Sequence, residues 1–402
     1  MTGAVEDAYR DEWGRVVATL IRITGDWSLA EDCAAEAFET ALAKWPVDGE
    51  PRNPGAWLTT VAKNRALDRL RRAATEARKL KEVAIMQELE EPGESDDRLR
   101  LIFTCCHPAL PLESRVALTL RTVAGLTTPE IASAFLVPEP TMAQRLVRAK
   151  RKIVNAGIPY RVPPPELLPE RLSGVLAVLY LLFNEGYAAS SGAVLLRTDL
   201  AAEAIRLTRA VVQLTPREPE VRGLLSLMLL QHSRREARVD AHGDLVTLDD
   251  QDRSRWDRAA IAEGLSLLEA EPAPGPYQLQ AAIAAVHASA QDAGSTDFVS
   301  LAHLYNRLYG VAPTPIIALN RAIAIGMAHG FETGLDAIDE VATSTDLGNY
   351  YLVAAARADF LRRLGRLAEA AVEYRRALQT VPTDPERRYL ARRLDEVKTG
   401  NN

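Results

Sequence analysis

The chain has 402 residues, 47% of them hydrophobic and 25% charged, which is enough for two or three globular domains with sizeable cores. Three cysteines do not make a disulfide framework, and the N-terminus has neither the basic nor the apolar region of a secretory signal. The most apolar run, residues 174–183, is too short to span a bilayer, so we expect a cytoplasmic protein without a membrane partner. The net charge of −6 comes wholly from residues 162–402, so only the neutral first part suits nucleic-acid binding.

Two helices of opposite charge are predicted near the N-terminus. Residues 28–45 place small apolar side chains on one helical face, with Asp32 and Glu36 one turn apart on another. A second helix, over residues 53–73, begins near Pro54 and leads into a strongly basic stretch. Four of the five tryptophans lie in the first 57 residues. Most of them are expected in the core, although an aromatic ring beside a basic helix also suits the binding of unstacked bases.

A short acidic segment and a Cys-Cys-His triplet follow. Residues 82–98 carry seven acidic side chains and one basic one, which predicts either a solvated linker or an extended acidic segment that mimics nucleic acid. Cys105, Cys106 and His107 are adjacent, and adjacent ligands do not have the spacing of a zinc site. We therefore expect them at the buried start of the next helix, with a redox or metal role as the alternative.

A helix-turn-helix is predicted over residues 126–154. Thr128 is the expected N-cap of its first helix, and the second helix is expected to begin at Glu139. The second helix has an apolar face with Met142, Leu146, Ala149 and Ile153. Its polar face contains Thr141, Gln144, Arg145 and Arg148. Gln pairs with adenine and Arg with guanine in the major groove, and residues 141–161 hold six basic side chains and no acidic one. The alternative is a surface hairpin with a solvated basic face.

Together these motifs resemble a known family. In order, AEDCAAEAFETALAKW, NPGAWLTTVAKNRALDRLRR and the helix-turn-helix are similar to the two domains of bacterial sigma factors of the extracytoplasmic-function (ECF) type, over about residues 5–155. In that family the first domain binds the clamp of RNA polymerase and the −10 promoter element, and the second domain binds the −35 element. The resemblance implies core RNA polymerase and promoter DNA as partners. It implies no catalytic residue, metal or cofactor, because the polymerase does the chemistry, so no enzyme is expected.

The resemblance also assigns roles to individual residues. It implies that Asp32 and Glu36 contact core polymerase. The side chains expected near the −10 element are Trp57, Thr59, Asn64, Arg65, Arg69, Arg71 and Arg72. Those expected at the −35 element are Thr141, Gln144, Arg145, Arg148 and Lys150.

The remainder of the chain is predicted to form helical repeats. Residues 159–170 contain five prolines and predict a semi-rigid spacer, and residues 171–398 predict stacked helix pairs. The stretch GRLAEAAVEYRRALQTVP has the spacing of a tetratricopeptide (TPR) helix. The polar stretch 236–256 is expected to be an ordered insertion, because Asp249, Asp250 and Asp252 lack the Gly and Glu of a calcium loop.

The stretch Asn184-Glu185-Gly186-Tyr187 directly follows an apolar helix. It resembles a signature of the sigma-factor group that carries a long helical-repeat C-terminal extension. Asn184, Glu185 and Tyr187 are expected either to satisfy buried groups at a domain junction or to form a contact site for the sigma-like domains or a signalling protein.

The expected fold is all-α, with two small helical sigma-like domains followed by a TPR-like domain. The expected boundaries are 1–81, a linker 82–98, 99–158, a spacer 159–170, and 171–398. Three functions are considered: a sigma factor modulated by its C-terminal domain, a polymerase-independent helix-turn-helix regulator with a partner- or ligand-sensing repeat domain, and a repeat-based adaptor. Only the first requires both a clamp-binding and a strand-melting surface.

Overall fold

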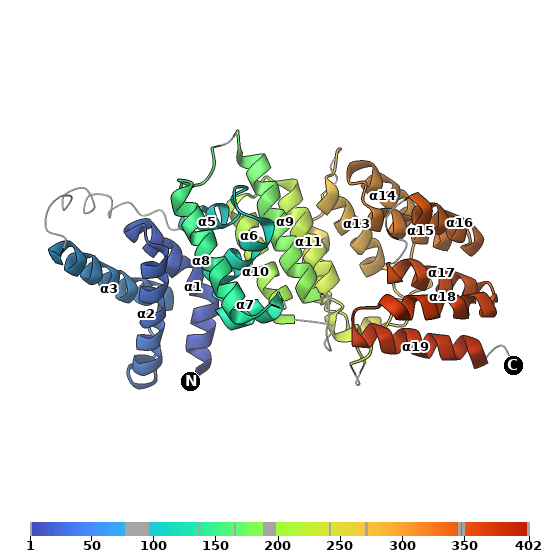
Figure 1. The fold of residues 1–402 in the computed structure, drawn as a ribbon, viewed down its shortest axis with the longest axis horizontal. Helices are drawn as coiled ribbons and strands as arrows, with labels where there is room; N and C mark the ends of the chain where they lie inside the picture. The colour runs from blue at the N-terminus through green and yellow to red at the C-terminus, as the bar shows by residue number, and fades with distance from the viewer. Residues whose placement is uncertain are drawn as a thin grey trace. The chain divides into compact units, whose positions relative to one another are not determined.

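The computed structural model is helical almost throughout the residues that it describes, which are 2–76, 96–135, 137–164, 166–187, 198–240, 243–269, 272–344, 347 and 350–399. In this part of the chain the β-structure is limited to one isolated bridge, between Val239 and Leu245. The prediction of an all-α fold is therefore confirmed. The chain forms two compact units, Met1–Leu181 and Leu182–Asn402 (Figure 1), and each is described by itself.

Unit 1 begins with three long helices that pack on one another, which we call the three-helix segment: α1 (Thr2–Thr24), α2 (Trp27–Asp48) and α3 (Pro54–Glu76). The predicted small-residue face of α2 is buried, with Ala30, Cys33, Ala37 and Ala41 all at 0% exposure. Asp26 caps α2 by accepting from the backbone N–H groups of Ser28 and Leu29. Both helices predicted here are confirmed.

The second part of unit 1 is the helix-turn-helix segment, made of α5 (Asp96–Cys105), α6 (Leu112–Thr122), α7 (Thr128–Ala134) and α8 (Glu139–Asn155). Helix α8 begins where predicted and buries the predicted face, Met142, Leu146, Ala149 and Ile153. The predicted cap of α7 was wrong by one residue. Thr127 is the cap, because its backbone N–H donates to Glu130 (2.7 Å) and its Oγ1 accepts from the Glu130 N–H (3.4 Å), a capping box.

The Cys-Cys pair lies in the core of this segment. Cys105 is the last residue of α5 and Cys106 follows it, so the prediction of burial is confirmed but the pair ends one helix and does not begin the next. Burial raises the pKa of the Cys106 thiol to about 11 and that of Cys105 further. Both thiols are therefore protonated at neutral pH and are poor nucleophiles. Most of the predicted linker, 82–98, lies outside the described residues.

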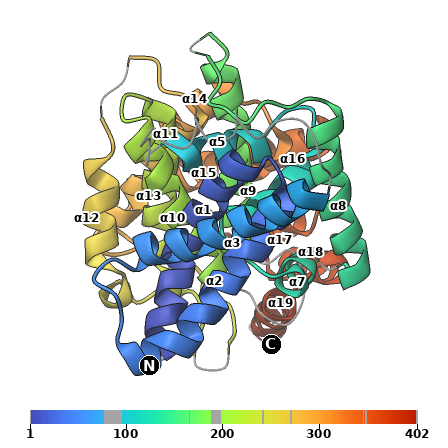
Figure 2. The same ribbon diagram turned by 90° about the vertical axis from the view of Figure 1, so that its left-hand side faces the viewer.

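The two segments of unit 1 pack directly against each other through α1. Trp13, which is 1% exposed, lies at the centre of this contact. Figure 2 shows the unit from the side of α2 and α3, with α1 next to them. Side-chain bonds of α1 in this contact include Tyr9 Oη to the Gly125 carbonyl (2.8 Å), Trp13 Nε1 to the Arg121 carbonyl (3.2 Å), Tyr160 Oη to the Ala18 carbonyl (2.9 Å), and Arg22 Nε to Asp97 Oδ2 (2.9 Å).

The boundary between the units falls inside α9 (Leu168–Tyr187), and the predicted spacer 159–170 lies within unit 1. The helices of unit 2 then follow in chain order: α10 (Thr198–Leu214), α11 (Pro219–His232), α12 (Arg258–Ser266), α13 (Pro276–Ser289), α14 (Phe298–Val311), α15 (Pro315–His329), α16 (Phe331–Ser344), α17 (Tyr351–Arg363), α18 (Leu367–Thr380) and α19 (Asp384–Thr399). Consecutive helices from α13 to α19 pack on each other, as stacked helix pairs do.

The stretch with TPR spacing forms α18 and the turn before it, and α18 packs on α17 as a helix pair. Gly365 has a φ of +76° in the turn, a backbone conformation that glycine adopts without strain. Ala370, Tyr374 and Ala377 of α18 are buried in the core of unit 2. The residues that suggested a repeat are therefore those that hold the pair together.

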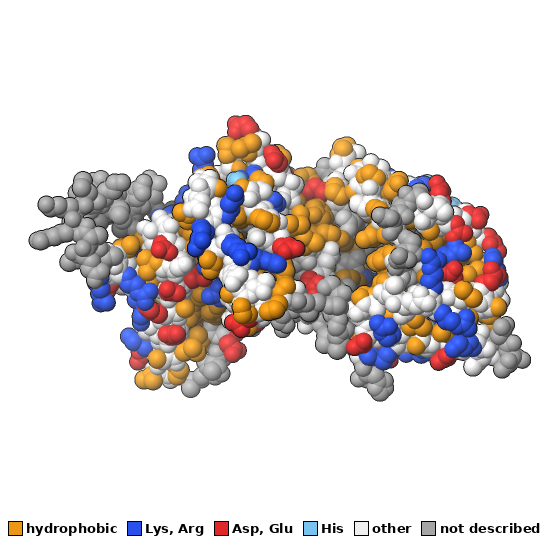
Figure 3. Space-filling model, in the orientation of Figure 1, with side chains coloured by type: hydrophobic (Ala, Val, Ile, Leu, Met, Phe, Trp, Pro, Cys, Tyr) orange, Lys and Arg blue, Asp and Glu red, His pale blue; other side chains and the backbone are white. Residues whose placement is uncertain are grey.

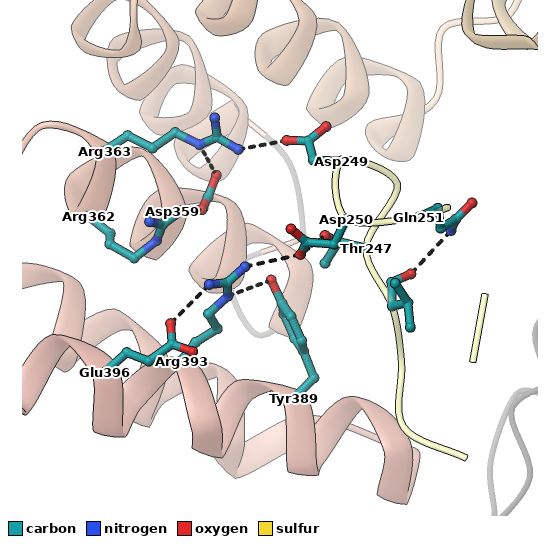
Figure 4. A network of polar contacts seen from close by, with 11 residues as sticks. Thr247, Asp249, Asp250, Gln251, Asp359, Arg362, Arg363, Tyr389, Arg393 and Glu396 are labelled. Carbon is teal, nitrogen blue, oxygen red and sulfur yellow. Dashed lines mark hydrogen bonds and ion pairs between the residues drawn. The ribbon is translucent and has the colours of Figure 1, made fainter. Parts of the chain in front are cut away.

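The polar stretch 236–256 is ordered, as predicted. Figure 4 shows how its carboxylates reach α17 and α19. Asp249 accepts from Arg363 (2.9 Å), Asp250 pairs with Arg393 (3.3 Å), and Asp252 caps a single helical turn, Arg253–Arg255. These acidic side chains bind protein groups. Across the described residues, no group of three or more His, Cys, Asp or Glu side chains is arranged to hold a metal ion.

The half-buried His287 on α13 predicts how the stability of unit 2 depends on pH. Burial, and then Arg234 and Arg253, lower the pKa of His287 on α13 to about 4. In the unfolded chain this pKa returns to about 6.5, so the unfolded state binds more protons between these values. Protonation of His287 is therefore expected to lower the free energy of unfolding of unit 2 by at most about 3 kcal/mol as the pH drops from 6.5 to 4.

Urea denaturation at pH 7 and pH 4.5, compared between wild type and His287→Phe, measures this contribution. The variant keeps an aromatic ring beside Phe298, whose centroid is 6.4 Å from that of His287. It is expected to lose less stability on acidification than the wild type. An equal loss in both proteins would contradict the assignment to His287.

Candidate promoter and polymerase interfaces

The polar face of α8 is open to solvent. Thr141, Gln144 and Arg148 are exposed at a spacing of three and four residues, which places them on one side of the helix. Figure 3 shows Lys and Arg side chains gathered over the region of α6 and α8. These three side chains present donors and acceptors that can reach base edges in a major groove.

Arg145 lies differently from the other residues predicted for this face. Its guanidinium pairs with Glu113 of α6 at 3.1 Å and lies 5.6 Å from the centre of the Phe135 ring, and its side chain is 22% exposed. Arg145 of α8 therefore packs against α6 and against the residue that follows α7. Glu113 would therefore compete with a base or a phosphate for this guanidinium.

Lys150 is turned away from the polar face of α8. Its Nζ lies 2.7 Å from Oε1 of Glu31 on α2, and its side chain is 19% exposed. The five residues predicted for the −35 element thus divide into three that are exposed together and two that hold ion pairs inside unit 1.

The two acidic residues predicted to contact polymerase also differ from each other. Asp32 is exposed on α2. Glu36 accepts from Arg65 (2.6 Å) and from Arg69, both on α3, so residues predicted for two different partners bind each other. Arg65 also donates to Thr40 Oγ1 (2.9 Å). Of these two carboxylates, Asp32 is therefore the one that is accessible to a partner.

The remaining residues predicted for the −10 element lie along α3. Trp57 is half-buried, with its ring edge-on to Trp45 at 5.7 Å between centroids. Thr59 is half-buried as well, whereas Asn64, Arg71 and Arg72 are exposed. The helix thus offers one partly covered indole and three exposed polar or basic side chains.

Sequence reasoning missed Glu31 and Glu113, which bind Lys150 and Arg145. Glu31 is next to Asp32 in the sequence but is 7% exposed. Glu31 lies four residues after Trp27, which is 6% exposed, and therefore at the edge of the buried face of α2. This spacing could have predicted that Glu31 is buried. No pattern in the sequence pointed to Glu113.

The stretch Asn184-Glu185-Gly186-Tyr187 forms the last turn of α9 and binds within unit 2. A Cβ on Gly186 would lie 2.4 Å from the backbone N of Ala201, so glycine permits the close approach of α9 to α10. The Tyr187 ring lies 3.6 Å from the Arg238 guanidinium, and its Oη accepts from Arg234 at 2.5 Å. Asn184 and Glu185 are half-buried. This packing accounts for Gly186 and Tyr187 structurally, and a contact role for the stretch stays a prediction.

Comparison with known proteins identifies both segments of unit 1. A model of sigma-70 region 2 matches residues 8–76, and a model of sigma-70 region 4 matches residues 100–153. The chain belongs to the sigma-70 family, and within it to the ECF type. The probable ECF RNA polymerase sigma factor SigI of Mycobacterium tuberculosis is 28% identical to it over 171 residues, which are 40% of this chain and 58% of that protein.

This ECF-type chain also matches a family and a protein without an assigned role. Residues 171–271 match a family of unknown function, DUF6596. An uncharacterized protein of Rhizobium meliloti is 39% identical over 409 residues, covering 98% of this chain and 96% of its own length. No solved structure matches the chain. Within the described residues, no helix has the length and apolar character needed to cross a membrane.

Proposed function

We propose that this sigma-70 family protein binds core RNA polymerase and directs it to promoters. The observation that carries the proposal is the exposed face of α8, formed by Thr141, Gln144 and Arg148 in a stretch without acidic residues. It lies on the second helix of a helix-turn-helix, the position from which such motifs read the major groove. The region 4 match over 100–153 supports a −35 element as its target.

The three-helix segment is the proposed site of core binding and of strand opening. Asp32 offers an exposed carboxylate to a basic surface of the polymerase, while Asn64, Arg71 and Arg72 line an exposed side of α3. Basic side chains suit the phosphates of a melted strand, and a half-buried indole such as Trp57 suits stacking with an unpaired base. The region 2 match over 8–76 supports this assignment.

Unit 2 is proposed to modulate transcription through protein contacts. The chain beyond residue 161 carries the whole net negative charge, so it adds nothing to the attraction for DNA. Stacked helix pairs commonly offer an extended surface to a protein partner. A signalling protein or the sigma segments themselves are the proposed partners of this unit.

Replacing Arg148 with alanine tests the proposed −35 contact. If the guanidinium reads a base, the variant holoenzyme is expected to lose about 1 to 3 kcal/mol, or about 5- to 150-fold, in affinity for its preferred −35 sequence. Binding to sequences changed at the contacted base should fall much less. Equilibrium binding of holoenzyme to a set of −35 variants measures both. A uniform loss over the whole set would show a phosphate contact and contradict base reading by Arg148.

A further inference from the structure

Three arginines of unit 2 gather around two aromatic rings. The guanidinium carbon of Arg234 lies 6.0 Å from the centre of the Tyr187 ring and 5.9 Å from that of the Trp256 ring. The guanidinium of Arg238 lies 3.6 Å from the Tyr187 ring, and that of Arg253 lies 4.7 Å from the Trp256 ring. Arg234 thus shares one ring with each of the other two arginines. We call Arg234, Arg238 and Arg253 the arginine cluster.

The hydrogen bonds of the arginine cluster go to neutral oxygens. Arg234 donates to Tyr187 Oη at 2.5 Å and to the side-chain amide oxygen three residues before it. Arg238 donates to the backbone carbonyl of Tyr187. Arg253 donates over 2.7 Å to each of two backbone carbonyls at the end of α13. Within the part of the chain that the structure describes, none of the three guanidiniums bonds to a carboxylate.

The positive charge of the cluster is largely withdrawn from water. Arg238 and Arg253 are 8% and 7% exposed, and Arg234 is half-buried. Burial lowers the pKa of Arg238 and of Arg253, and the charge of Arg234 lowers both further. The carboxylates of Glu386 and Asp292 attract Arg238 and Arg253 respectively, but the pKa of each arginine stays lowered. Because a buried charge is costly unless an opposite charge lies beside it, an anion bound here would stabilise unit 2.

The cluster also keeps hydrogen-bond donors for such an anion. A guanidinium has five N–H groups in a planar fork, and the bonds described above use only Nη2 of Arg234 and Nη1 of Arg238. The Nε and the other Nη of these two arginines make no hydrogen bond to any described residue. The indole N–H of Trp256, which is 2% exposed, has no acceptor there either. Donors therefore outnumber acceptors in this region, and an anion would approach along the half-buried Arg234.

We propose that the arginine cluster binds a phosphate group, either free or as a phosphate monoester, with Arg234 as the principal contact and Arg238 beside it. Such a group carries a charge of about −1.5 to −2 at pH 7 and three acceptor oxygens. Guanidiniums pair with phosphate oxygens in a bidentate manner, which a planar fork favours. A carboxylate brings a single negative charge and offsets less of the charge of three arginines. Unit 2 thereby gains a small-molecule site that is separate from the promoter-binding segments.

Isothermal titration calorimetry of the full-length protein, without polymerase, tests this site. The probes are sodium phosphate, adenosine monophosphate as a phosphate monoester, and sodium acetate as a carboxylate, all at the same ionic strength. Arg234→Gln removes the charge, whereas Arg234→Lys keeps the charge and loses the planar fork. Arg375→Gln is the matched control, because Arg375 is exposed on α18 and the variant makes the same change in net charge. Circular dichroism reports the helicity of each variant.

The wild type and Arg375→Gln are expected to bind at least one of the two phosphate compounds about tenfold more tightly than acetate. Arg234→Gln should lose about tenfold or more of this affinity, and Arg234→Lys should lie between them. Tighter binding of adenosine monophosphate would identify a phosphate monoester as the ligand, and equal or tighter binding of phosphate would identify the free ion.

Three results would overturn the proposal: binding of neither phosphate compound by the wild type, acetate binding as tight as phosphate binding, or wild-type affinity in a folded Arg234→Gln protein. If Arg234→Gln loses helicity, the comparison with Arg234→Lys decides, and unchanged affinity in that variant would overturn the role of Arg234. Because polymerase and DNA are absent from the experiment, its outcome is independent of the proposed function in transcription.

Discussion

Reversing the charge of Asp32 is expected to weaken binding to core polymerase by about 30-fold, or roughly 2 kcal/mol. The carboxylate is exposed on α2, so the lysine is accommodated without loss of packing. Its neighbour Glu36 is unsuitable for the same test, because it holds Arg65 and Arg69 of α3, and its reversal would set three positive charges against each other. Co-purification and equilibrium titration with core polymerase measure the effect of Asp32→Lys.

Asp48→Lys is the matched control for this reversal. Asp48 is exposed at the end of α2, 16 residues from Asp32, and therefore lies on nearly the opposite side of the helix. The Asp48→Lys variant makes the same change in net charge as Asp32→Lys and should leave core binding near the wild-type level. An equal weakening by both variants would mean that net charge alone governs binding, and equal binding by all three proteins would remove Asp32 from the interface.

Trp13→Ala is expected to destabilise unit 1 by about 3 to 5 kcal/mol, which is a large part of the stability of an ordinary domain. The side chain is 1% exposed and is packed against Tyr9 and Phe38 at centroid distances of 4.9 and 6.0 Å. Its loss leaves a cavity between the two segments and an unpaired carbonyl at Arg121. Urea denaturation followed by far-UV circular dichroism measures the transition of unit 1.

Trp57→Ala tests whether Trp57 contacts DNA, in contrast to Trp13, which lies in the core. Trp57 is half-buried on α3, so its removal should cost distinctly less stability than that of Trp13. If it stacks on an unpaired base, the variant should nevertheless open promoters more slowly while still binding core polymerase. A loss of stability as large as that of Trp13→Ala would show that Trp57 belongs to the core and not to the −10 interface.

The sequence was sufficient to predict most elements of the fold, because periodicity is a local property. The buried stripe of α8, from Met142 to Ile153, was evident from spacing alone, and the proline at position 54 indicated the beginning of α3. The cap of α7 was misassigned, since Thr127 and Thr128 both suit the role and only the reciprocal bonds with Glu130 distinguish them. The packing of α1 on α6 depends on the approach of residues more than 100 positions apart, such as Trp13 and Arg121, which no local pattern encodes.

For the candidate interfaces, the sequence predicted residue types on the correct helices but not which side chains are available to a partner. Thr141, Gln144 and Arg148 are exposed together as their spacing predicted. Lys150 shares the basic character of Arg148, yet two further positions along α8 turn it toward Glu31. Ion pairs with residues of other helices determine whether such a basic side chain is available to a partner.

The central claim is that the chain directs core polymerase to promoters, and transcription in vitro tests it most directly. Core polymerase would be given DNA templates randomised over the −35 and −10 positions, with and without the full-length protein, and the transcripts sequenced. We predict that the protein raises the transcript yield, that templates with one pair of elements are enriched, and that Arg148→Ala weakens enrichment at the −35 position. The same yield and the same start sites with and without the folded protein would contradict the claim.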